Sequence, residues 1–162
     1  GDAFNLYVFL EISSLSSYVL IAFGKDRRAL TASYQYLVMG TIGATFILIG
    51  VGLLYMMTGT LNLADLSARL PAVSATRTVQ TALAFLVVGI GLNQALFPMH
   101  LWLPNAYAFA PSAVTAFFAA TATKVAVYVL LRFLFTVFGA AFAFEVMTLG
   151  IFFVVIGAAA VD

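Results

Sequence analysis

The stretch "NQALFPMHLWLPNAYAFAP", residues 93–111, decides how this chain can fold. It contains an adjacent pair of amides, the single histidine, the single tryptophan and three of the four prolines of a sequence that is 64% hydrophobic. Pro98 and Pro104 each lack a backbone N–H, and each ring clashes with the preceding helical turn. A helix that enters this stretch is therefore predicted to break over 97–104.

The rest of the chain is too apolar for a water-soluble domain. Charged residues make up 8% of the 162 residues, and the mean hydropathy is +1.12. Apolar runs of about 20 residues match the roughly 30 Å hydrocarbon core of a bilayer. Backbone polar groups inside lipid must be satisfied within helices or closed barrels, and the alternating pattern of barrel strands is missing from the sequence. The sequence predicts an all-α, polytopic membrane protein.

Five hydrophobic segments are predicted to form the transmembrane helices of a single unit over 1–162, and the third of them contains the break. Their expected ranges are 4–24, 33–57, 79–103, 113–136 and 141–161. Small residues in the second segment, Gly40, Gly43, Ala44 and Gly50, favour close packing of helix backbones. Because the chain opens with glycine and stops directly after an apolar run, it is expected to be a fragment of a longer protein.

The first two predicted loops indicate the orientation of the chain and a short additional helix. The first loop contains Lys25, Arg27 and Arg28, which the positive-inside rule places in the cytoplasm. The second loop is predicted to form a short interfacial helix between an Asn62 cap and a Pro71 stop, with the leucines at 63, 66 and 70 on one face.

Two ionisable side chains fall inside predicted membrane helices. Glu11 has Ser14 three residues later on its helix face, and Lys124 has Thr121 three residues before it. Ionisable groups at this depth are costly and usually face a polar cavity. A structural ion pair, or a lysine that extends to the membrane interface, is the alternative interpretation. Because burial disfavours both charged forms, we expect Glu11 and Lys124 to exchange protons.

The broken helix supplies further polar groups. Non-helical backbone at membrane depth is tolerated where it is buried in protein or lines a water-filled cavity, and broken helices supply ion pathways in transporters. His100 is expected to relay protons beside the break, although a hydrogen-bonded structural histidine is the alternative. The residues expected to line the pathway are Asn93, Gln94, Pro98, Pro104, Ser14 and Thr121.

Several functions are disfavoured by composition. Without cysteine and with one histidine, the chain offers no thiolate chemistry, no cluster of metal ligands and no nucleophile with an adjacent base. Seven basic and six acidic residues, mostly in loops, give no nucleic-acid footprint. We therefore expect neither cofactor nor metal, and a transporter subunit rather than a stand-alone enzyme.

Four motifs in order resemble one known family. They are "GDAFNLYVFLEISSLSSYVL", "LLYMMTGTLNLADL", "ALFPMHLWLPNAYAFAPSAVTA" and "TKVAVYVLLR". Together they resemble the proton-conducting antiporter-like membrane subunits, closest to the D-type subunits of the Mrp-type Na⁺/H⁺ antiporters. Those subunits are related to the pumping subunits of complex I and of membrane-bound hydrogenases. The resemblance implies about five helices of an inverted-repeat fold that has roughly fourteen.

The resemblance also implies function. Glu11 matches the family's buried glutamate, Lys124 its central lysine, and His100 the histidine beside the broken helix. The implied role is proton translocation along a buried polar axis within a multisubunit monovalent cation/proton antiporter of a prokaryotic cell membrane. Its implied partners are other membrane subunits, the lipid bilayer, protons, and Na⁺ or K⁺.

One residue departs from the family pattern. Asn93, in "GLNQALFP", stands where the family usually has a lysine, and a neutral amide cannot pair with Glu11 by charge. A water wire, a cation from another helix, or a degenerate structural subunit are the three interpretations of this change. A membrane-arm subunit of a redox-driven complex, with its redox chemistry in partner subunits, is the remaining alternative function.

Overall fold

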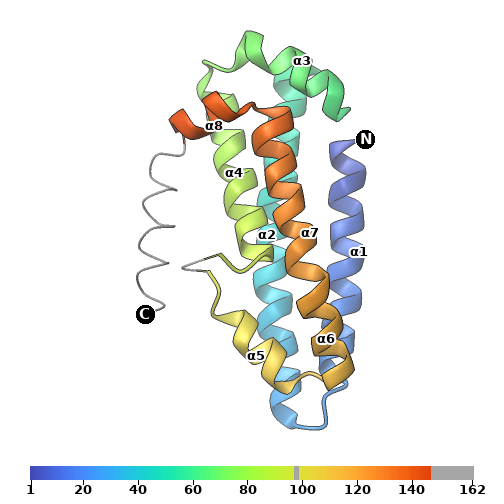
Figure 1. Ribbon diagram of the computed structural model, residues 1–162. Helices are drawn as coiled ribbons and strands as arrows, with labels where there is room; N and C mark the ends of the chain where they lie inside the picture. The colour runs from blue at the N-terminus through green and yellow to red at the C-terminus, as the bar shows by residue number, and fades with distance from the viewer. Residues whose placement is uncertain (97–98, 147–162) are drawn as a thin grey trace.

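The structure is a computed structural model that describes residues 1–96 and 99–146, and these form helices joined by short turns (Figure 1). A π-helical segment, Arg132–Val137, continues α7. The helices are α1 Ala3–Ala22, α2 Arg27–Thr58, α3 Leu63–Val73, α4 Arg77–Asn93, α5 Trp102–Phe109, α6 Ser112–Ala120, α7 Ala122–Leu131 and α8 Ala140–Val146.

Within residues 1–96 and 99–146, three helical stretches are long and apolar enough to cross a membrane. They are α1, α2 and the stretch Ser112–Val137, which comprises α6, α7 and the π-helical segment. The shorter α4 has 17 residues and is followed, after a break, by the eight residues of α5. Of the predicted segment 141–161, the start lies in α8 and the rest, from residue 147, lies outside the described residues. The prediction of a helical, polytopic membrane protein is confirmed.

The long α2 runs the length of the bundle and contacts α1, α4 and α5 (Figure 1). It begins at Arg27, ahead of the expected start at residue 33, because the Asp26 side chain caps it by accepting a hydrogen bond from the Arg28 N–H at 2.9 Å. At 1.5 Å per residue, its 32 residues span about 48 Å, more than the hydrocarbon core. Its ends therefore reach the polar layers of the membrane.

Small residues allow α2 to pack closely against its neighbours, as the sequence predicted. A Cβ on Gly89 of α4 would lie 2.6 Å from the Gly43 carbonyl oxygen of α2. On another face of α2, the Tyr18 hydroxyl fills the space that a Cβ on Gly40 would need. Since no side chain fits at these positions, glycine sets the distance between the helices.

The short α3 covers one end of the bundle (Figure 1). Asn62 caps it through its side chain, and the leucines at 63, 66 and 70 are buried on one face, as expected. Pro71 does not stop this helix, which continues to Val73. An isolated bridge between Asp2 and Asn62 joins the starts of α1 and α3.

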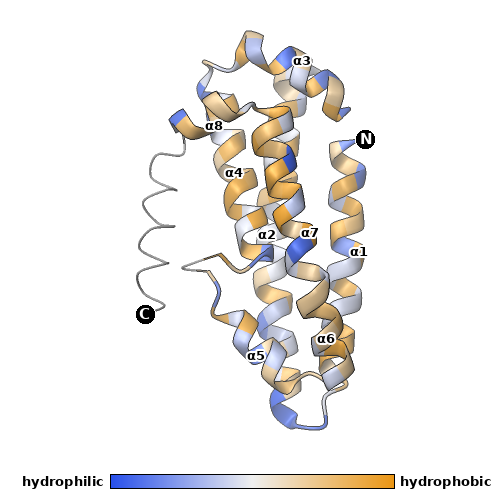
Figure 2. Ribbon diagram, in the orientation of Figure 1, coloured by the Kyte–Doolittle hydropathy of each residue, from blue (hydrophilic) through white to orange (hydrophobic). Residues whose placement is uncertain are grey.

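Two apolar clusters form the core. One lies at the α3 end and includes Leu66, Leu83 and Phe133, while the other is aromatic and includes Tyr36 and Trp102. Polar positions interrupt the apolar ribbon at mid-height, where α4 ends and α7 begins (Figure 2). Candidate functional groups within the membrane are therefore expected at this level of the bundle.

Candidate functional site at two helix breaks

The first break is made by the chain that follows α4. Ala95 adopts a left-handed conformation with φ of 56°. The Leu96 N–H donates to the Gly91 carbonyl at 2.9 Å and the Ala95 N–H to the Leu92 carbonyl at 3.3 Å. These two bonds form a Schellman motif, which ends a helix and satisfies its last carbonyls. The helix therefore ends at Asn93, four residues before the start of the break predicted from prolines.

Pro104 does not interrupt the helix that enters this stretch. Pro104 is the third residue of α5, where the N–H of a helix has no partner within the helix, so it belongs to a helix start rather than a break. Pro98, also expected to line the pathway, lies outside the described residues.

Trp102 connects the two sides of the first break. Its indole Nε1–H donates to the Leu92 carbonyl near the end of α4, with an N–O distance of 3.1 Å. Its ring stacks on Tyr36 of α2, with centroids 4.2 Å apart and planes within 1°. The start of α5 is thereby held against both α2 and α4.

A second break separates α6 from α7 at Thr121, whose φ and ψ are −122° and −56°. The Thr121 hydroxyl donates to the Phe117 carbonyl at 2.7 Å. The Lys124 ammonium donates to the Ala119 carbonyl. The Phe117 carbonyl also accepts from the Thr121 backbone N–H at 3.0 Å, so the hydroxyl adds to a ladder bond there, while the Lys124 ammonium supplies a side-chain donor to the Ala119 carbonyl.

A cavity of about 420 Å³ lies between α1, α2, the end of α4 and the helices on either side of the second break. Much of its lining is apolar. Its polar lining consists of Ser13, Ser14, Ser17, Tyr36, Asn93, Thr121 and Tyr128. Three residues predicted to line a pathway, Ser14, Asn93 and Thr121, therefore meet in one cavity that touches both breaks. Hydroxyl and amide groups of this kind can hold water by hydrogen bonds.

Glu11 is half-buried on α1, three residues before Ser14, and is not among the residues that line the cavity. Its carboxylate lies within electrostatic range of the Tyr18 and Tyr36 phenols. Tyr36 lines the cavity, so the acid acts electrostatically on one residue of the cavity wall.

Lys124 does not match the expectation of a buried base. It is exposed on the surface of the described chain and does not line the cavity. The reason is the bond to Ala119, because it draws the ammonium along the helix toward the break. Lys124 therefore lies at the second break, whereas Glu11 lies on α1.

Gln94 and His100 flank the first break. The Gln94 amide oxygen is buried and accepts no hydrogen bond from residues 1–96 and 99–146, so it can accept one from water or from a further part of the protein. His100 is half-buried in the turn before α5. Neither residue lines the cavity, so the structure does not bring them together with Ser14 and Asn93.

Sequence reasoning missed two features of this region. The break at Thr121 falls in a run without proline or glycine, so only the alternation of threonine and alanine before Lys124 hinted at it. Trp102 and Tyr36 also received no role, although the single tryptophan was noted within the proline-rich stretch.

The fold and the cavity define the class: a polytopic membrane protein with two interrupted helices around polar side chains. Residues 1–161 match the family described as the NADH:quinone oxidoreductase/Mrp antiporter transmembrane family, and the chain belongs to it. The resemblance inferred from the four motifs is confirmed.

Two relatives represent the two kinds of protein in this family's description, one each. The chain is 55% identical over 141 residues to NADH-quinone oxidoreductase subunit N of Desulforudis audaxviator, covering 87% of this chain and 28% of the relative. It is 39% identical over 132 residues to the D-type Na⁺/H⁺ antiporter subunit of Bacillus subtilis, covering 82% of this chain and 27% of the relative. The chain thus spans just over a quarter of the length of these relatives.

A solved structure shares the fold. It is the membrane-bound sulfane sulfur reductase, an archaeal respiratory membrane complex, with a TM-score of 0.79 and 42% identity. The match covers 83% of this chain and 27% of that one. The fold of this chain is therefore similar to part of one chain of a respiratory membrane complex.

Proposed function

We propose that this chain forms part of the proton path of a multisubunit monovalent cation/proton antiporter. The observation that carries the proposal is the cavity at which both helix breaks meet, with Ser14, Asn93 and Thr121 on its wall. An apolar bundle has no packing reason to place polar groups together at membrane depth, whereas a hydrated path requires them.

The path runs from Glu11 through the cavity to Lys124. Glu11 exchanges a proton with water held by Ser14 and the neighbouring hydroxyls. Asn93 forms hydrogen bonds with the same water. It does so as a neutral group, whereas a lysine at this position would bring a charge. Lys124 accepts the proton at the second break, and His100 serves as a relay on the side of α5. Further helices of the full-length protein complete the surroundings of Lys124, since an ammonium at this depth faces protein or water rather than lipid.

A second candidate is a membrane-arm subunit of a redox-driven complex. It is favoured by the 55% identity to a subunit named for NADH-quinone oxidoreductase and by the fold shared with a respiratory complex. The same proton path serves either function. Co-purification separates them: small antiporter subunits indicate the first, and subunits with metal clusters or a quinone site indicate the second.

Proton flux in vesicles that contain the full-length protein in its complex tests the path. Glu11→Gln and Lys124→Ala are each expected to abolish flux, because each removes a proton-exchanging group. Lys25→Gln, in the loop between α1 and α2, is the matched control and should retain it. Unchanged flux in a correctly assembled Glu11→Gln or Lys124→Ala complex would contradict the proposal.

A third variant separates the water path from a purely structural subunit. Asn93→Leu keeps the size of the side chain but removes its hydrogen-bonding groups. Loss of one hydrogen bond to the proton-carrying water, at about 1.4 kcal/mol, corresponds to roughly tenfold slower flux. Asn93→Gln should restore much of it. Equal flux in all three proteins would favour the structural alternative.

A further inference from the structure

A groove of about 500 Å³ lies between α2 and α5, separate from the polar cavity. Its walls are mainly apolar and include Val38, Met39 and Leu101. Tyr34, at its edge, is 66% exposed, and Leu101 is 72% exposed. The groove therefore opens on the surface of the described bundle.

An amide pair lies on the groove wall. The Asn105 side-chain N–H of α5 donates to the Gln35 amide oxygen of α2 at 3.1 Å. Both residues are exposed, and each side-chain NH₂ group has two donors, so this bond uses one of four. Polar amides are unfavourable against acyl chains alone but suit the ester region of a phospholipid.

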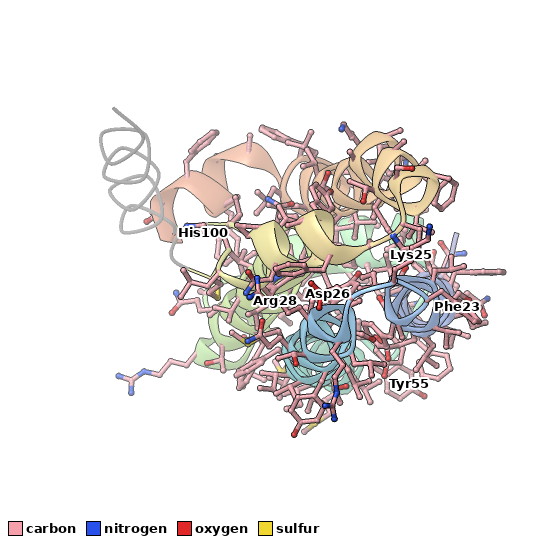
Figure 3. The ribbon with its side chains drawn as sticks, turned by 90° about the horizontal axis from the view of Figure 1, so that it is seen from below. Phe23, Lys25, Asp26, Arg28, Tyr55 and His100 are labelled. Atoms are coloured by element: carbon pink, nitrogen blue, oxygen red, sulfur yellow. The ribbon has the colours of Figure 1, made fainter. Side chains whose placement is uncertain are left out.

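Two arginines precede the groove on the same side of α2. Arg27 and Arg28 come seven residues, or two helical turns, before Tyr34 and Gln35, so each pair lies on one helix face about 10 Å apart. The Arg28 guanidinium lies 5.8 Å from the centre of the Phe109 ring at the end of α5. Seen from below, Arg28 lies at the junction of α2 and α5 (Figure 3). The cations therefore lie at the membrane-interface end of the groove.

We propose that this groove binds an anionic phospholipid. The arginines bind the phosphate, the amide pair contacts the ester groups, and one acyl chain lies along Val38, Met39 and Leu101. The polar layer of one leaflet is roughly 5–8 Å thick, so a cation at the interface and an apolar groove two turns deeper match the layout of one lipid. This inference does not depend on the proposed proton path.

Charge selects this occupant over a protein helix or a neutral lipid. The loop and the first turn of α2 carry three cations, Lys25, Arg27 and Arg28, and one acid, Asp26. An apolar groove alone would accept any hydrophobic partner. Basic residues at the end of the groove favour an anionic headgroup, as basic pockets between membrane helices do in general.

The test uses the full-length protein in its complex, in bilayers of phosphatidylglycerol and phosphatidylcholine. Photoactivatable phosphatidylglycerol with a diazirine on the acyl chain is crosslinked, and adducts are mapped by mass spectrometry. Adducts are expected on residues 34–39 and 101–105, and more of them than with the corresponding phosphatidylcholine probe. Absence of adducts there, as when another helix covers the groove, would overturn the proposal.

Charge variants identify the headgroup site. Each basic residue near an anionic surface contributes about fivefold to affinity, so Arg27→Gln with Arg28→Gln should weaken phosphatidylglycerol binding about thirtyfold. Lys25→Gln removes a charge from the loop and not from this helix face, and should have a much smaller effect. Equal labelling in the double variant and the wild type would also overturn the proposal.

A variant without a charge change covers the case in which the double variant fails to assemble. Val38→Trp narrows the groove while both arginines remain. It should reduce labelling of the groove by phosphatidylglycerol and by phosphatidylcholine alike. Unchanged labelling would show that the acyl chain lies elsewhere. Excess inorganic phosphate should not displace the lipid probe, and displacement would indicate a phosphate site in place of a lipid site.

Discussion

At the scale of single residues, backbone conformation determines where α4 ends. Ala95 is the non-glycine residue with positive φ among residues 1–96 and 99–146. The left-handed conformation is unfavourable for a residue with a Cβ. It is retained here because the Schellman bonds and the Trp102 indole satisfy the end of α4. Asn93 is thereby the last helical residue and lines the cavity.

Replacing Ala95 with glycine should stabilise the protein. Relief of left-handed strain contributes roughly 1–2 kcal/mol, and the greater entropy of glycine in the unfolded chain offsets about half of it. Unfolding of the purified full-length protein in detergent should show a gain of about 0.5–1 kcal/mol. Ala110→Gly is the control, because Ala110 has φ of −68° and should only lose stability. A destabilised Ala95→Gly would contradict the strain argument.

At the scale of helices, interruptions at membrane depth are stabilised by specific side chains. The first break depends on the bond from Trp102 to the Leu92 carbonyl, and the second on bonds from Thr121 and Lys124. Lys124 thus has both a structural bond and a proposed proton-transfer role.

Trp102→Phe should weaken the first break while it keeps an aromatic ring against Tyr36. It removes the indole donor from the Leu92 carbonyl, which still accepts from the Ala95 N–H, at a cost of about 0.5–1.5 kcal/mol. Trp102→Leu also removes the ring stacking, so a further loss of roughly 0.5–1.5 kcal/mol is expected. Detergent unfolding midpoints of the two variants measure both effects. Wild-type stability in Trp102→Phe would indicate that water replaces the indole.

Close packing of α2 on α4 is tested by glycine substitution. Gly89→Ala places a Cβ 2.6 Å from the Gly43 carbonyl oxygen, so the helices must separate, at a cost of about 1–3 kcal/mol. Gly52→Ala meets no atom within 4 Å in the described bundle, and should be neutral or gain up to about 1 kcal/mol. Thermal unfolding of both variants measures the difference. Similar stabilities would contradict the close approach.

At the scale of the whole molecule, polar groups lie at the two ends of an apolar bundle and at one level between them (Figure 2). One end is the basic turn between α1 and α2, and the other is the α3 cover (Figure 1). Exposed apolar side chains such as Phe9, at 72%, and Met56, at 76%, are suited to lipid or to further helices of the protein.

Accessibility of single cysteines tests the orientation of the bundle. In a full-length variant without other cysteines, Lys25→Cys should react with a membrane-impermeant maleimide only from the cytoplasmic side, by the positive-inside rule. Ala75→Cys, in the exposed turn between α3 and α4, should react only from the outer side. Intact and inverted vesicles distinguish the two sides. The reverse pattern would show that the three basic residues do not set the orientation.

The sequence by itself determined the membrane class, the first four helical segments, the close-packing glycines, the Asn62 cap and the family. These follow from hydropathy, side-chain size and local hydrogen-bonding chemistry, which act over a few residues. The same chemistry identified Glu11, Lys124, His100 and Asn93 as candidates, and their roles remain predictions.

Only the tertiary structure decided where the helices break and which candidates meet. The first break begins at the end of α4, with Ala95 in the left-handed conformation, ahead of the predicted range 97–104, and Trp102 and Tyr36, distant along the chain, hold the helix ends. The second break lies in an apolar run without proline or glycine, where the Thr121 hydroxyl and the Lys124 ammonium donate to carbonyls at the end of α6. Ser14, Asn93 and Thr121 share a cavity through the packing of α1, α2 and α4 against α6 and α7. Local propensity cannot encode such contacts, because they form between residues far apart along the chain.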